Sequence, residues 1–107
     1  MCLRAFVVKR KIMKSINPFN NTVIANYTEH TSAEVTAIIS EVYADWPEWK
    51  NTPFEHRAAS FRKAAQVLRN RKDEFAMLIT SEMGKIIRES LAEVEKCAVA
   101  CDFYAEL

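Results

Sequence analysis

The sequence predicts a mainly α-helical chain in which an N-terminal β-hairpin precedes about four helical segments. Two β-prone runs flank a proline–asparagine turn near the N-terminus, and apolar residues downstream recur three and four positions apart. Helix-start and helix-stop signals separate these apolar stripes. At 107 residues, the chain has the length of one small domain or of part of one.

Composition excludes several classes of function. Half of the residues are apolar, 27% are charged and the net charge is +1, so we expect an ordinary globular protein with no nucleic-acid partner. Gly84 is the single glycine, so no glycine-rich loop can cradle a phosphate or a dinucleotide. The three cysteines, Cys2, Cys97 and Cys101, are an odd number and favour a reducing compartment, for which we expect the cytoplasm.

Residues 1–13 form a basic extension ahead of the patterned sequence. Its apolar run, Ala5 to Val8, is too short for a signal peptide or a membrane span, so we expect no membrane association. The patterned sequence begins at Met13. This favours two interpretations of the extension, as a disordered tail or as sequence upstream of the true translation start.

The hairpin is expected over residues 14–28. Its two β-prone runs are Ser15–Ile16 and Thr22–Ala25. Pro18 fixes the backbone of the connecting turn, and the asparagines beside it tolerate left-handed conformations.

Two helices are expected next, over residues 31–46 and 53–70. Thr31 and Glu34 form a capping box at the first start, and Pro47 is expected to end that helix. Thr52 is expected to cap the second helix. The apolar stripes are Val35, Ile38, Ile39, Val42 and Trp46 in the first, and Phe54, Ala58, Phe61, Ala65 and Leu68 in the second, which shows Arg57 to solvent.

The last two helices are expected over residues 73–83 and 87–106. The chain should bend at residues 70–72, and Gly84 should adopt the left-handed conformation that ends the third helix. The stripe of the third comprises Phe75, Leu78, Ile79 and Met83, and that of the fourth comprises Ile87, Leu91, Val94, Ala98, Cys101 and Ala105.

Candidate reactive groups have plainer structural interpretations. Cys97 and Cys101 lie one helical turn apart, a spacing that would suit a soft metal, but His30 and His56 are remote in sequence, so packing is favoured. Both histidines are expected at the surface. The carboxylates Glu89, Glu93 and Glu95 are expected to form a solvated charge pattern, and the aromatic group Tyr43, Trp46, Trp49 and Phe54 to pack at the corner between the first two helices.

Taken in order, these motifs resemble the aldehyde dehydrogenase superfamily. Ile16-Asn17-Pro18 followed by Thr22 to Ala25 is similar to the opening hairpin of that family, although the usual turn glycine is absent. Trp46 to Arg57 is similar to a tryptophan–proline–arginine stretch, and Ile79 to Lys85 to the L-I-T-x-E-M-G-K block. The segment Glu93 to Glu106 resembles the succinate-semialdehyde dehydrogenases.

The resemblance implies that residues 14–107 are the N-terminal portion of a much longer enzyme. Such enzymes oxidise an aldehyde with NAD or NADP through a cysteine thiolate, and they assemble as homo-oligomers. The matching positions here include no catalytic or cofactor-binding residue, so we expect this chain alone to be inactive and to bind no cofactor. Succinic semialdehyde is the expected aldehyde.

The resemblance also implies a structural site for a monovalent cation. In some members, the carbonyl before the Asn-Pro pair and a helix carboxylate bind such an ion, and the matching positions are Ile16 and Glu93. A surface glutamate without a ligand is the alternative interpretation.

A different class of function is also open. The chain could be a stand-alone helical interaction or oligomerisation module, whose stripes bury against a partner or a second copy. Leu91, Val94 and Cys101 have few partners evident in so short a sequence, so we expect a marginal monomer that self-associates.

Overall fold

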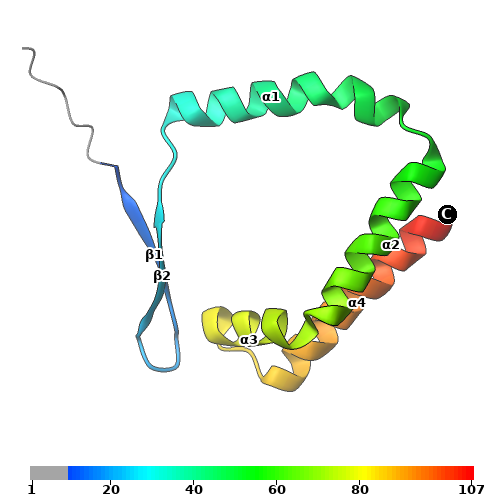
Figure 1. The fold of residues 1–107 in the computed structure, drawn as a ribbon. Helices are drawn as coiled ribbons and strands as arrows, with labels where there is room; N and C mark the ends of the chain where they lie inside the picture. Colours follow the sequence, from blue (N-terminus) through cyan, green and yellow to red (C-terminus); the bar gives the residue numbers. More distant parts are fainter. Residues whose placement is uncertain (1–9) are drawn as a thin grey trace, which may run out of the picture.

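The computed structural model describes residues 10–107 and confirms the predicted order of a hairpin followed by four helices (Figure 1). Residues 1–9 of the basic extension lie outside the described residues. The strands are β1 (Ile12–Ile16) and β2 (Val23–Thr28), and the helices are α1 (Ser32–Asn51), α2 (Phe54–Asn70), α3 (Lys72–Met83) and α4 (Ile87–Glu106). No helix of the described part is both long and apolar enough to cross a bilayer.

The β-hairpin is antiparallel and begins earlier than expected. Ile12 pairs with Thr28, so the strand takes in the last residues of the supposed extension, and the register shifts between Ser15 and Ile16. Asn21 closes the turn at φ 59°, and its amide donates to the Asn17 carbonyl at 2.8 Å. Asparagine thus takes the left-handed position for which a glycine is usual.

Helix α1 begins as predicted but ends later. The Thr31 hydroxyl accepts from the Glu34 amide while the Glu34 carboxylate accepts from the Thr31 amide, which completes the capping box. The expectation that Pro47 ends the helix is wrong, because the helix continues to Asn51. Proline removes one donor and leaves the carbonyl four residues back unpaired, and water can satisfy that carbonyl on so exposed a helix.

The extension of α1 also corrects the role of Thr52. It lies at the C-terminal cap of α1, where its amide donates to the Trp49 carbonyl and its hydroxyl to the Glu48 carbonyl. Pro53 occupies the N-cap of α2 and makes no side-chain capping bond.

The core lies between α2 and α4, which run side by side in opposite directions (Figure 1). Alanines rather than large side chains are buried there: Ala58, Ala65, Ala98 and Ala105, together with Val94. Small residues let two helices approach closely, so the phenylalanines of the predicted α2 stripe are left at the edge of the contact.

Helix α3 joins this pair and supports the hairpin. A single residue, Arg71, breaks the helical run between α2 and α3, and Gly84 ends α3 at φ 69°, as predicted. The Ser15 hydroxyl donates to Glu82 at 2.6 Å, and Pro18 lies against Gly84. The hairpin therefore rests on the C-terminal end of α3.

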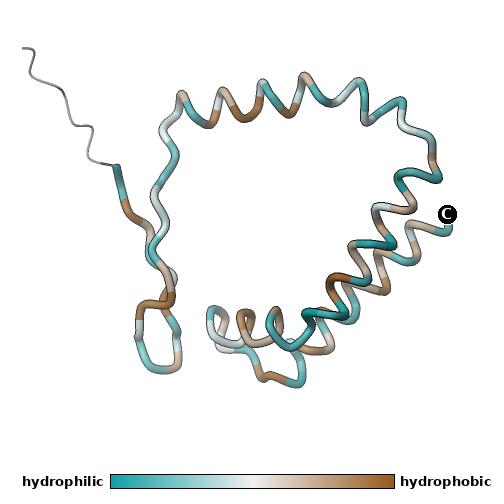
Figure 2. The backbone as a smooth tube through the Cα atoms, viewed as in Figure 1, coloured by the Kyte–Doolittle hydropathy of each residue, from teal (hydrophilic) through white to brown (hydrophobic). Residues whose placement is uncertain are grey.

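The described elements enclose an open shape rather than a globule. The radius of gyration is 19.7 Å, whereas a compact 100-residue domain has about 13 Å. The accessible surface is 9329 Å², against about 6,100 Å² for a compact 12.3 kDa protein. Helix α1 makes few contacts with the other elements, although hydrophobic residues recur along it (Figure 2).

Candidate functional site

The two residues of the expected cation site lie on different elements. Ile16 ends β1 and Glu93 lies on α4, where its carboxylate pairs with the ammonium of Lys85. The hydrogen bond that Lys85 donates to the Glu93 carboxylate raises the pKa of Lys85 above its ordinary value. Glu93 is thus an ion-pair partner in this structure, and its role as a cation ligand stays a prediction.

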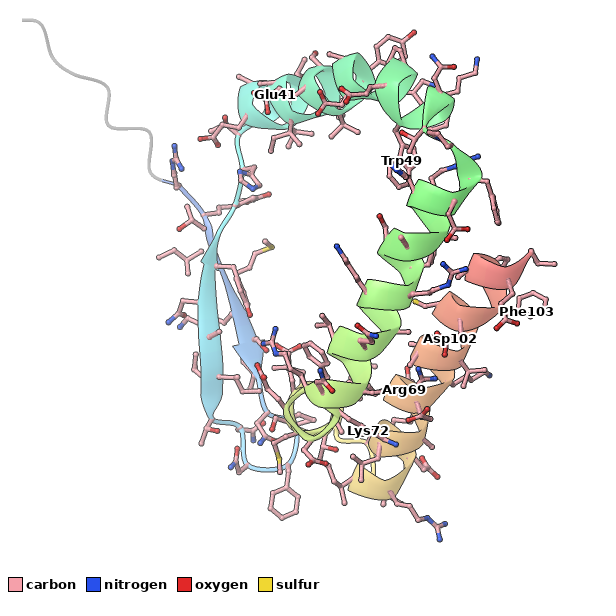
Figure 3. All side chains as sticks on the ribbon, turned by 45° about the vertical axis from the view of Figure 1, so that its right-hand side comes forward. Glu41, Trp49, Arg69, Lys72, Asp102 and Phe103 are labelled. Carbon is pink, nitrogen blue, oxygen red and sulfur yellow. The ribbon has the colours of Figure 1, made fainter. Side chains whose placement is uncertain are left out.

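One of the acids predicted to be solvated, Glu95, links α4 to both α2 and α3. Glu95 accepts from Arg69 at 3.1 Å and from Lys72 at 2.9 Å, and Arg69 also pairs with Asp102 at 2.7 Å. Arg69 and Asp102 face each other across α2 and α4 (Figure 3). Arg69 at the end of α2 and Lys72 at the start of α3 thus form one ionic cluster with Glu95 and Asp102 of α4.

The cluster shifts pKa values in the direction that favours the charged forms. The hydrogen bonds from Lys72 and then Arg69 lower the pKa of Glu95, and those to Asp102 and then Glu95 raise the pKa of Arg69. All four side chains are more than a third exposed to solvent, so water and salt screen these pairs strongly. The cluster therefore links α4 to α2 and α3 through exposed ion pairs.

The cysteines and histidines form no metal centre in the part of the chain that the structure describes. Cys97 is exposed and Cys101 is half-buried, both as free thiols. Residues 10–107 hold no group of three or more His, Cys, Asp or Glu side chains placed to bind an ion. The predicted packing of Cys101 is partial, and His30 and His56 are exposed, as expected.

The most distinctive surface is the apolar face of α1, which consists of Ile38, Ile39, Val42, Tyr43 and Trp46. No residue of α1 is buried; Val42 is 66% and Tyr43 77% exposed. The prediction that the aromatic group packs at the helix corner is therefore wrong. Trp49 does lie beside α2, where it shares a groove with His56, but it remains 44% exposed (Figure 3).

Sequence reasoning missed one feature, the surroundings of Arg57. The side chain is half-buried rather than solvated, and it lies in a pocket with Phe54, Phe61 and Tyr104. Spacing alone placed Arg57 on the polar side of α2 and gave no sign that α4 brings Tyr104 beside it.

The fold matches part of the solved structures of two aldehyde dehydrogenases. It matches an NAD-dependent benzaldehyde dehydrogenase from Corynebacterium glutamicum at 25% identity with a TM-score of 0.86, over 90% of this chain and 21% of that one. It also matches a succinic semialdehyde dehydrogenase from Streptococcus pyogenes, solved with NADP+, at 28% identity with a TM-score of 0.81. That match covers 87% of this chain and 21% of the other.

The sequence comparison agrees with the structural one. The aldehyde dehydrogenase family model matches residues 6–107, so the chain belongs to the aldehyde dehydrogenase family. A probable NADP-dependent succinate-semialdehyde dehydrogenase of Synechocystis is 39% identical over 92 residues, and one of Deinococcus radiodurans is 37% identical over 92 residues. These matches cover 86% of this chain but only 20% and 19% of the two relatives.

Proposed function

We propose that residues 14–107 form the N-terminal scaffold of an NAD(P)-dependent aldehyde dehydrogenase that oxidises succinic semialdehyde to succinate. The observation that carries the proposal is the 39% identity to the Synechocystis relative over 86% of this chain. Its fold supports the same assignment, because hairpin and helices match a succinic semialdehyde dehydrogenase. In the whole enzyme the partners would be the aldehyde, NAD or NADP and further copies of the subunit, in the cytoplasm.

Within that enzyme, this segment supplies support rather than chemistry. Its charged side chains pair with one another across α2, α3 and α4. Within residues 10–107, Cys97 and Cys101 belong to no group of three or more side chains that could hold a metal ion. The apolar face of α1 offers a surface against which further polypeptide can pack. Ile16 and Glu93 would add a structural cation site in the complete enzyme.

Two assays test the proposal. The purified 107-residue chain, mixed with succinic semialdehyde and NADP, should give no rise in NADPH absorbance. A chimera in which residues 14–107 replace the matching segment of the Synechocystis enzyme should oxidise succinic semialdehyde. Activity of the chain alone would refute the scaffold role. A chimera that folds but is inactive would show that residues 14–107 cannot replace the matching segment of a succinate-semialdehyde dehydrogenase.

The exposed face of α1 also favours the second candidate, a stand-alone oligomerisation module. Sedimentation of the isolated chain separates the two candidates. A discrete, soluble oligomer of fixed stoichiometry would support the module, whereas a concentration-dependent series of aggregates fits an incomplete scaffold.

A further inference from the structure

Cys97 and Cys101 are free thiols one helical turn apart on α4, and neither the helix core nor the ionic cluster uses them. Cys97 is exposed and Cys101 is half-buried, so both residues keep surface open to solvent. The buried residues of α4 are others: Ser90, Val94, Ala98 and Ala105. Packing against α2 and α3 therefore does not account for the two thiols.

The spacing of the pair determines how its sulfur atoms can be joined. Side chains four positions apart lie on the same face of a helix, with Cβ atoms about 5–6 Å from each other. A disulfide needs Cβ atoms about 3.5–4.5 Å apart, so α4 would have to deform to form one. An ion placed between two side chains spans the wider gap, as it does in helical metal sites with ligands at positions i and i+4. The geometry of α4 thus favours an ion bridged by two thiolates over a disulfide.

The number of donors restricts which cation the pair can bind. Within residues 10–107, no third His, Cys, Asp or Glu side chain completes a metal-binding group with Cys97 and Cys101. Zinc takes four protein ligands, or three together with water, so the pair alone is too small for it. Thiolates are soft ligands that select Cu(I), a soft monovalent ion for which two sulfur atoms suffice.

Lys96 provides a charge that suits such a complex. Each thiol loses its proton when it binds a metal, so two thiolates and one monovalent cation carry one net negative charge. Lys96 lines the same surface hollow as Cys97, and it forms no ion pair with a residue of the described part. Its ammonium is therefore available to offset that charge.

We propose that Cys97 and Cys101 bind one soft monovalent cation, represented by Cu(I), through their two thiolate sulfurs across one turn of α4. Two S–H bonds break, two S–Cu bonds form and two protons pass to solvent, with no change in oxidation state. The site uses residues of α4 alone and is independent of the proposed function.

Competition for Cu(I) with bathocuproine disulfonate, measured without oxygen on the 107-residue chain, tests the site. We expect one Cu(I) bound per chain, and loss of that binding in Cys97→Ser and in Cys101→Ser. Cys2→Ser, which removes the remaining thiol, should bind Cu(I) as the parent chain does. The matched control is Cys101→Ser combined with Val99→Cys, which keeps the number of thiols but moves one to an exposed position on the opposite side of α4. This control should not regain binding.

Several results would overturn the proposal. Equal binding by the parent chain and the Val99→Cys control would show that the number of thiols, rather than the helical turn, decides affinity. Loss of binding in Cys2→Ser would place the cation elsewhere, and failure of the parent chain to compete for Cu(I) would show that the pair binds none. Dimerisation on addition of zinc, measured by sedimentation, would indicate a four-sulfur site between two copies instead. No dehydrogenase step enters these measurements, so their failure leaves the assays of the proposed function untouched.

Discussion

Helices α1 and α4 have the same length and similar apolar periodicity, yet only α4 buries residues. Helix α4 packs against α2 and α3 and buries Val94, Ala98, Ala105 and Ser90. Helix α1 carries larger apolar side chains and buries none. Amphipathic periodicity therefore predicts a face that requires a partner, and the fold decides whether the chain itself provides one.

The contact between α2 and α4 should give the largest response to mutation. Ala98 is fully buried where the two helices approach, so Ala98→Leu forces them apart and should lower the free energy of unfolding by about 1–3 kcal/mol. Urea unfolding followed by circular dichroism measures this change. Ala100→Leu, at an exposed position of the same helix, should have little effect, and equal losses from both variants would contradict close α2–α4 packing.

The junction between the hairpin and α3 should give the next largest effect. Gly84 has φ 69°, which costs an alanine about 1–2 kcal/mol. A Cβ there would also lie 3.1 Å from the Pro18 ring. Gly84→Ala should therefore destabilise the chain in thermal unfolding and loosen the hairpin from α3.

Asn21→Gly is the matched control for that junction. Asn21 also has a positive φ but lies in the exposed hairpin turn, so glycine should leave the unfolding midpoint nearly unchanged. A large drop in the unfolding midpoint for Asn21→Gly, with none for Gly84→Ala, would show that the turn, rather than the junction, limits stability.

Features set by neighbouring residues could be predicted from the sequence. The capping box of Thr31 and Glu34, the left-handed Gly84 and the asparagine turn each depend on contacts within a few positions. The end of α1 could not be predicted in this way. The sequence shows that Pro47 removes a helical hydrogen bond. Whether the helix ends there depends on whether water can reach the carbonyl that is left unpaired, which the sequence does not show.

Features set by distant residues could not be predicted. Ala65 and Phe61 both fit the apolar periodicity of α2, but only Ala65 is buried, because α4 packs close to α2 at that position. The pairing of Glu95 with Arg69 spans 26 positions, and Tyr104 reaches the Arg57 pocket from another helix. No periodicity within one helix reports such contacts.

The ionic cluster should make the α2–α4 contact sensitive to acid. Because the pKa of Glu95 is lowered below its ordinary 4.5, its ionised form stabilises the fold above pH 4.5, and this contribution is lost as the pH falls through the lower folded-state value. Glu95→Gln should remove that part of the acid sensitivity. Unfolding midpoints measured between neutral pH and pH 3 test this.

The expected change is small, because the cluster is open to solvent. Glu41→Gln, on α1, provides the control, since Glu41 forms no ion pair with a described residue (Figure 3). A profile in which Glu95→Gln keeps the full acid sensitivity of the parent chain would contradict the role of the cluster.

The exposed face of α1 should give the smallest effect on stability and the largest on association. Ile39 and Val42 are 63% and 66% exposed, so Ile39→Lys with Val42→Lys removes no buried contact, and each substitution should change the free energy of unfolding by less than about 0.5 kcal/mol. The same pair places two charges on the apolar face and should reduce self-association several-fold in sedimentation. Val67→Lys, which charges an exposed position of α2 instead, should leave association unchanged. A large loss of stability in the double variant would mean that α1 packs within its own chain, and the contrast with α4 would then disappear.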